Sequence, residues 1–162
     1  MKKISIIVPA HNEEQTIVPL LQAVRRAIEE LSIPLFEVIV IDDGSNDTTR
    51  SLLMAAPELY DHLIALDDQH GKGGAVLQGL QRATGDFVLF QDADLEYDPR
   101  DYAALIEPAI GHGAQIVMGS RFIAPRMTRV FYFWHKMGNQ LITLLFNLLN
   151  NTTFTDIYSC YL

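Results

Sequence analysis

An apolar strand runs directly into a group of carboxylates in the stretch Phe87-Val88-Leu89-Phe90-Gln91-Asp92-Ala93-Asp94-Leu95-Glu96. Hard divalent cations such as Mg²⁺ and Mn²⁺ prefer oxygen ligands, and one or two carboxylates usually hold them together with substrate phosphates. Asp92, Asp94 and Glu96 meet this requirement, so the stretch indicates a site for Mg²⁺ or Mn²⁺. A solvated acidic turn that caps the helix after Pro99 is the alternative for the same residues.

The alternation of strand and helix continues along the whole chain. Predicted strands cover residues 4–8, 37–41, 62–66, 87–90 and 116–118, and predicted helices cover 14–31, 48–56, 73–83 and 99–110. Unbroken apolar runs such as Val38-Ile39-Val40-Ile41 are typical of strands buried on both faces. The sequence therefore predicts an α/β domain with a mostly parallel sheet flanked by helices.

Length and composition fit one soluble domain. The chain has 162 residues, 49% apolar and 20% charged, which is enough for a substantial core. Its single cysteine, Cys160, rules out an internal disulfide framework, so we expect a cytoplasmic protein. No apolar run approaches the ~20 residues of a membrane span, and the N-terminal run is too short for a signal peptide.

Charge is divided unevenly between two parts of the chain. Residues 1–119 contain 8 basic and 19 acidic residues, whereas residues 120–162 contain 4 basic and 1 acidic. The acidic part argues against general nucleic-acid binding. The basic, aromatic second part favours an anionic acceptor or an anionic membrane surface, although a short segment can also lack acids by chance.

Three predicted strands end in polar motifs. These are Pro9-Ala10-His11-Asn12-Glu13, Asp42-Asp43-Gly44-Ser45 and Asp92-Ala93-Asp94. Because ligands of parallel sheets bind beyond the carboxyl ends of the strands, we expect the motifs to converge there. Helix capping accounts for Asn46 to Thr48 and for Glu13, but not for Asp42 at its strand terminus.

Six motifs resemble, in order, those of the family 2 glycosyltransferases with the GT-A fold, and among them the polyprenyl-phosphate sugar transferases such as the dolichyl-phosphate mannosyltransferases and glucosyltransferases. They cover nearly the whole chain: Pro9–Glu13, Asp42–Thr48, Gly71–Ala75, Asp92–Pro99, Gly119–Phe122 and Thr155–Asp156. The resemblance implies one GT-A domain, with a donor and metal part in residues 1–119 and an acceptor-side, membrane-proximal part in 120–162. It also implies inverting transfer of a hexose from a nucleotide diphosphate sugar, of the GDP-mannose or UDP-glucose type, to a polyprenyl phosphate, with Mg²⁺ or Mn²⁺.

The same resemblance assigns the donor residues. Nucleotide-sugar contacts are expected from Pro9, His11, Glu13, Asp42, Asp43, Lys72 and Asp92. Either Asp42 or Asp43 would accept a hydrogen bond from the base, while His11 replaces a tyrosine that relatives often carry. Lys72 lies among glycines, where a cation can approach a diphosphate. This stretch matches neither a P-loop nor a dinucleotide-binding fingerprint.

Metal and acceptor residues follow in the same way. Asp92, Asp94 and Glu96 would hold the metal, and Asp94, Arg121 and Asp156 would be the catalytic residues. Arg121 and His135 would bind the acceptor phosphate, with an ordinary solvated basic face as the alternative. Asp156 would orient donor or acceptor, with helix capping as the alternative.

A helix is expected across Phe131–Leu149, with apolar residues around much of its circumference. Trp134 and nearby basic residues favour an amphipathic helix at a membrane surface, with peripheral contact on the cytoplasmic face. An ordinary buried helix packed on the sheet is the alternative.

Two other functions remain open. One is a glycosyltransferase with a saccharide or another soluble acceptor. The other is a non-catalytic remnant that binds nucleotide sugars, because the chain ends at Leu162 inside the last shared motif, where relatives continue. A nucleotidyltransferase is disfavoured, because the first strand lacks a Gly-rich signature after it.

Overall fold

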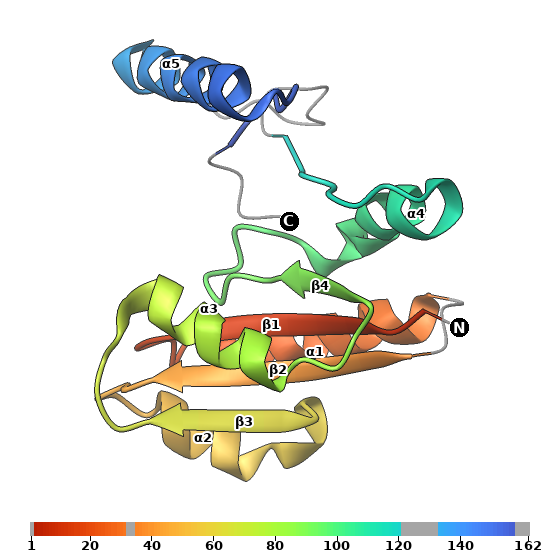
Figure 1. Cartoon of the computed structure of the whole chain (residues 1–162). Coiled ribbons are helices and arrows are strands. Elements are labelled where there is room, and N and C mark those ends of the chain that lie inside the picture. The colour runs from red at the N-terminus through yellow and green to blue at the C-terminus, as the bar shows by residue number, and fades with distance from the viewer. Residues whose placement is uncertain (1, 32–34, 121–132, 158–162) are drawn as a thin grey trace.

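The structure is a computed structural model that describes residues 2–31, 35–120 and 133–157. Four parallel strands form a sheet in the order β3-β2-β1-β4. They are β1 (Ile4–Ala10), β2 (Phe36–Asp43), β3 (His62–Leu66) and β4 (Phe87–Phe90). The helices are α1 (Ile17–Glu30), α2 (Thr49–Ala55), α3 (Gly71–Arg82), α4 (Tyr102–His112) and α5 (Phe133–Asn150), with short 3₁₀ helices at Pro57–Leu59 and Pro99–Asp101. The predicted mostly parallel sheet flanked by helices is confirmed (Figure 1).

Both faces of the sheet are buried, which explains the unbroken apolar runs of β1 and β2. One cluster, with α1, contains Ile6, Val8, Leu20 and Val24; the other, with α3, contains Ile7, Ile39, Ile41 and Ala75. Gly79 of α3 sits directly on the second cluster. A β-carbon there would lie 2.7 Å from Cγ2 of Ile7, so glycine allows α3 to approach the sheet closely.

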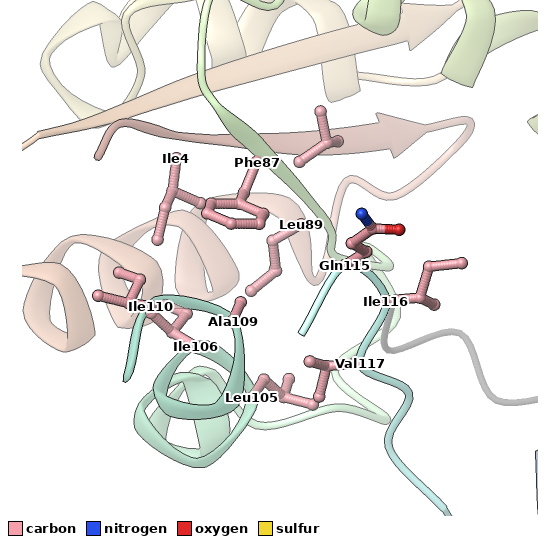
Figure 2. Close-up of a pocket in the computed structure, with 11 residues that line it drawn as sticks. Ile4, Phe87, Leu89, Leu105, Ile106, Ala109, Ile110, Gln115, Ile116 and Val117 are labelled. Atoms are coloured by element: carbon pink, nitrogen blue, oxygen red, sulfur yellow. The ribbon is translucent and has the colours of Figure 1, made fainter. Parts of the chain in front are cut away.

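The predicted fifth strand at Ile116–Met118 is wrong: no strand is assigned to these residues. The segment passes beside β4, which lies at the edge of the sheet, without entering a hydrogen-bonded ladder. An apolar cavity of about 110 Å³ separates the two. Figure 2 shows Phe87 and Leu89 of β4 pointing toward Ile106 of α4, with Val117 also lining the cavity. A run of three apolar residues gives a strand only when it pairs in register with a neighbour.

A buried polar cluster closes the amino end of the sheet. The Glu37 carboxylate accepts hydrogen bonds from Nζ of Lys3 (2.7 Å), Oγ of Ser5 (2.5 Å) and the backbone N–H of Thr84 (2.5 Å). Burial opposes the charge of Glu37, but these donors outweigh it and lower its pKa to about 2. The cluster therefore ties β1, β2 and the segment before β4 together through one ionised side chain.

Helix α5 turns its polar side toward its own chain and its apolar side outward. Nδ2 of Asn147 donates to the carbonyl oxygen of Phe154 (2.7 Å), and Nδ2 of Asn139 donates to Asp156 (3.1 Å). Exposed apolar side chains recur at helical spacing: Trp134, Met137, Leu141, Ile142, Leu144, Leu145, Leu148 and Leu149. In Figure 1 the helix lies away from the four-stranded sheet. None of the described helices combines the length and apolar character that crossing a bilayer requires.

Candidate functional site

A polar cavity of about 220 Å³ opens at the carboxyl end of the sheet. Its lining comes from the end of β1 and the residues after it, the end of β2, the start of α3 and the residue Gln69 before it, and the segment after β4: Pro9, Ala10, His11, Glu13, Asp43, Gln69, Gly71, Lys72, Ala75, Asp92, Ala93 and Asp94. The expected convergence of the three strand-end motifs is therefore present. The apolar cavity beside β4 has no charged residue in its lining, so of these two cavities the polar one suits a charged ligand.

Asp42 and Asp43, the two alternatives for the base, occupy different environments. Asp42 is fully buried, and its carboxylate accepts from Nε of Arg50 (2.5 Å) and from the backbone N–H of Ser45 (3.2 Å). Asp43 lines the cavity, and its Oδ1 accepts from the backbone N–H of His70 (2.8 Å). The structure thus places Asp43 in the cavity and gives Asp42 an internal cationic partner.

Gly44 allows the turn that follows Asp43. Its φ of +65° lies in the left-handed region, and a β-carbon would lie 2.7 Å from the backbone carbon of Asp68. The positive φ and the lack of space for a β-carbon both require glycine at this position. Glycine therefore allows the loop after β2 to pack directly on the loop after β3. This contact brings Asp43 next to His70.

The loops after β1 and β2 are also joined by hydrogen bonds. The backbone N–H of Glu13 donates to Oγ1 of Thr49 (2.8 Å), and Oγ1 of Thr48 donates to Oε2 of Glu14 (2.7 Å). The Glu13 carboxylate, which lines the cavity, accepts from Oγ1 of Thr16 (2.5 Å). These bonds fix the first and second motifs as one unit. They also explain the start of α1 at Ile17 rather than at Glu14.

Lys72 and Asp92 form an ion pair inside the cavity. The distance from Nζ of Lys72 to Oδ1 of Asp92 is 2.5 Å, with the Lys72 side chain 54% exposed and the Asp92 side chain 14% exposed. Lys72 is the second residue of α3, where the helix dipole also favours negative charge. The cavity therefore holds a cationic group and a helix start suited to a diphosphate.

The three predicted metal ligands do not converge. Asp92 and Asp94 line the cavity, whereas Glu96 is exposed and outside its lining. Oδ1 of Asp94 accepts from the backbone N–H of Glu96 (3.0 Å). Within the described ranges, no group of three His, Cys, Asp or Glu side chains could hold a metal. Asp92 and Asp94 fit a divalent cation of the type that two carboxylates and substrate phosphates hold together.

The predicted acceptor residues lie outside the polar cavity or outside the residues that the structure describes. Arg121 is outside the described residues. His135 is exposed on α5, and Asp156 is buried and bonded to Asn139. Neither belongs to the lining of the polar cavity. Their predicted roles in phosphate binding and catalysis stay predictions.

The sequence reasoning missed Gln69, Asn12 and Arg50. Gln69 lines the cavity, and its place just before the Gly-rich stretch is the sequence feature that could have identified it. Asn12 joins two loops, and Arg50 holds the buried Asp42 and the carbonyl oxygen of Leu66. An arginine eight residues after a strand-end aspartate gives no local pattern, so its partners emerge only from the fold.

Comparisons with known proteins agree on this fold. The mannosyltransferase PcManGT from Pyrobaculum calidifontis, solved with GDP-Man and Mn²⁺, superimposes with a TM-score of 0.54 and 31% identity over 64% of this chain and 30% of that one. Glucosyl-3-phosphoglycerate synthase from Mycobacterium tuberculosis, solved with UDP, gives 0.55 and 28% over 67% and 40%.

Sequence relatives point the same way. An undecaprenyl-phosphate 4-deoxy-4-formamido-L-arabinose transferase from Pectobacterium atrosepticum is 32% identical over all of this chain and 48% of its own length. This chain therefore spans about half the length of such relatives. The family model described as glycosyl transferase family 2 matches residues 5–161. The chain belongs to glycosyl transferase family 2, as its motifs indicated.

Proposed function

We propose that the polar cavity binds a nucleotide diphosphate sugar and that the protein transfers the sugar to a polyprenyl phosphate. The observation that carries the proposal is the convergence of Asp43, Lys72, Asp92 and Asp94 in one cavity from three separate segments. Similar proteins support the ligand class, since the two solved structures carry GDP-Man or UDP and the Pectobacterium relative is named for undecaprenyl phosphate.

Each part of the donor has a matching part of the cavity. Pro9, His11, Glu13 and Asp43 form the side that would receive the nucleoside. Lys72 and the start of α3 would receive the diphosphate, because a cation and a helix N-terminus both attract it. Asp92 and Asp94 would hold Mg²⁺ or Mn²⁺. When bound, that ion neutralises charge on the leaving diphosphate.

The acceptor requires little proton transfer from the protein. A phosphate monoester has a second pKa of about 6, so its oxygen is already anionic at neutral pH. We infer a single displacement in which this oxygen bonds to the anomeric carbon while the bond to the nucleoside diphosphate breaks, which inverts the configuration. Binding and orientation then supply most of the rate. Arg121 and His135 are the proposed phosphate contacts, and Asp156 a proposed orienting residue.

We further propose that α5 provides peripheral contact with the cytoplasmic face of a membrane. Its outward stripe is apolar and includes Trp134, which is 73% exposed. Lys136 follows this tryptophan by two residues in the first turn of the helix, and the helix contains no acidic residue. Aromatic and basic residues beside an apolar stripe favour the headgroup region of an anionic bilayer.

Calorimetry on the purified chain tests the donor site. GDP, UDP, GDP-mannose and UDP-glucose are titrated with Mn²⁺, and again with EDTA. Metal-dependent binding of one base is expected and would identify the donor class. Equal binding with and without Mn²⁺ would contradict the metal assignment, and no binding would contradict the donor site. Turnover with a polyprenyl phosphate, compared with a soluble saccharide, then separates the two acceptor classes and a non-catalytic remnant.

A further inference from the structure

Asn12 occupies a junction between the loops after β1 and β2. Its φ of +57° lies in the left-handed region, which few residues other than glycine adopt. Its backbone N–H donates to Oγ of Ser45 (3.0 Å), and its Oδ1 accepts from the backbone N–H of Asn46 (2.9 Å). The unusual backbone therefore directs the Asn12 amide between the two loops.

The backbone N–H of Asn46 fixes the orientation of the Asn12 side-chain amide. The N–H of Asn46 only donates, so Asn12 must turn Oδ1 toward it and Nδ2 away from it. Nδ2 then lies 3.2 Å from Nε2 of His11. Because Nδ2 is a donor, Nε2 of His11 must be the acceptor and carry no proton.

The other ring nitrogen gives the same assignment independently. Nδ1 of His11 lies 2.8 Å from the carbonyl oxygen of Asp43, which only accepts. Nδ1 must therefore carry the proton. The hydrogen bonds run in one direction, from the N–H of Asn46 through Asn12 and His11 to the carbonyl oxygen of Asp43, and Asn46 follows Asp43 closely in the chain. This series of hydrogen bonds is compatible with one neutral tautomer of the imidazole, the one that is protonated at Nδ1.

We propose that Asn12 is a positioning residue for nucleotide binding, which holds His11 as the Nδ1–H tautomer with a neutral ring in the cavity wall. The inference rests on the proposed function, because His11 matters to the ligand through its place in that wall. The charged residues that share the cavity with the ring are Glu13, Asp43, Lys72, Asp92 and Asp94. Asn12 itself is exposed and outside the lining, so it acts through His11.

The tautomer is measurable without any nucleotide. Two-bond ¹H–¹⁵N correlation spectra of the full chain near pH 7.5 distinguish a protonated from an unprotonated ring nitrogen. The chain has five histidines, and His11→Phe identifies the signals of His11. The expected pattern is a protonated Nδ1 and an unprotonated Nε2. A ring that is mainly Nε2–H would overturn the inference.

Substitutions at Asn12 connect the tautomer with binding. Asn12→Gly keeps access to the left-handed backbone but removes the amide, so only the Asp43 carbonyl still favours the Nδ1–H tautomer. A smaller Nδ1–H population and a roughly tenfold weaker Kd for UDP or GDP with Mn²⁺ are expected. Asn12→Asp keeps the shape but presents an acceptor to Nε2, so the ring spectra should show a protonated Nε2.

A double-mutant cycle separates positioning from a structural role. In the His11→Phe background, Asn12→Gly should cause little further loss of nucleotide affinity, because the residue through which Asn12 acts is gone. An equal loss in both backgrounds would overturn the proposal and assign Asn12 to loop structure alone. Failure of both nucleotides to bind the parent chain would instead contradict the proposed function, and the ring spectra would still decide the tautomer.

Discussion

The two ends of β2 place carboxylates in opposite situations. At the amino end, Glu37 is enclosed by donors from Lys3, Ser5 and Thr84. At the carboxyl end, Asp43 borders a cavity of about 220 Å³, together with Asp92 and Asp94. Both ends carry buried acidic side chains, so burial alone does not mark a functional site. What distinguishes them is whether the chain's own donors enclose the carboxylate or an open cavity adjoins it.

The largest expected effect is at the carboxyl end. Asp94→Asn should abolish metal-dependent nucleotide binding, a loss of more than roughly a hundredfold in Kd, because an amide is a weaker ligand for a hard cation. Calorimetry with Mn²⁺ measures the loss, and circular dichroism shows whether the fold is intact. Asp101→Asn removes an exposed carboxylate outside the cavity and is the matched control. Parent-like binding by Asp94→Asn would refute the metal assignment.

At the amino end, acid should act on stability. The folded-state pKa of Glu37 is about 2 and its ordinary value is 4.5, so its stabilisation is complete above pH 4.5 and is lost as pH falls toward 2. The contribution is on the order of 3 kcal/mol. Urea unfolding between pH 7 and pH 2 measures it. Glu37→Gln should lower stability at pH 7 and remove this part of the pH dependence, while other carboxylates keep theirs; an unchanged slope would contradict the assignment.

Ser5→Ala should reduce stability without affecting binding. Oγ of Ser5 donates to Glu37 and accepts from the backbone N–H of Gly85 (2.8 Å), so the substitution leaves a buried carboxylate and a half-buried N–H without that partner. The free energy of unfolding should fall by about 2 kcal/mol, while nucleotide affinity stays within about twofold. Ser51→Ala, at an exposed helical serine, should cost less than about 0.5 kcal/mol. A large loss of affinity in Ser5→Ala would mean that the two ends of the sheet are coupled.

The smallest effect is expected at Lys72. Lys72→Gln removes the cation from the cavity, and nucleotide diphosphate affinity should weaken roughly tenfold. Titration of UDP or GDP in the presence of Mn²⁺ measures the change. Arg82→Gln, in the last turn of the same helix, is the matched control and should bind as the parent does. Tighter nucleotide binding by Lys72→Gln would indicate that the ion pair with Asp92 competes with the ligand.

Sequence reasoning succeeded where one physical rule fixes the outcome. Parallel strands bring their carboxyl ends together, so the meeting of His11, Asp43 and Asp92 could be predicted before any coordinates. It could not separate Asp42 from Asp43, because neighbouring residues of a strand point to opposite faces and helices cover both faces here. The predicted strand at Ile116–Met118 failed because strand formation depends on a partner that local sequence does not specify.

The position of α5 was also beyond the sequence. Its apolar stripe could be recognised from the sequence. A stripe that is buried against the sheet and one that faces outward have the same helical spacing, so the pattern does not distinguish them. The deciding features are the bonds of Asn139 and Asn147 to residues 154–156, which turn the polar side inward. Such contacts between uncharged side chains and a following loop leave no periodic signal.

The edge position of β4 has a practical consequence for work with this chain. Its sequence, Phe87-Val88-Leu89-Phe90, contains no charge and no proline, and no described strand pairs with its outer side. Backbone groups along such an edge are a template for strands of other molecules. The segment that contains Ile116 passes beside this edge and shares a cavity with it, so intermolecular sheet formation in concentrated samples requires that segment to move aside. Ile116→Lys, at an exposed position of the segment, is a reasonable first change to discourage such association.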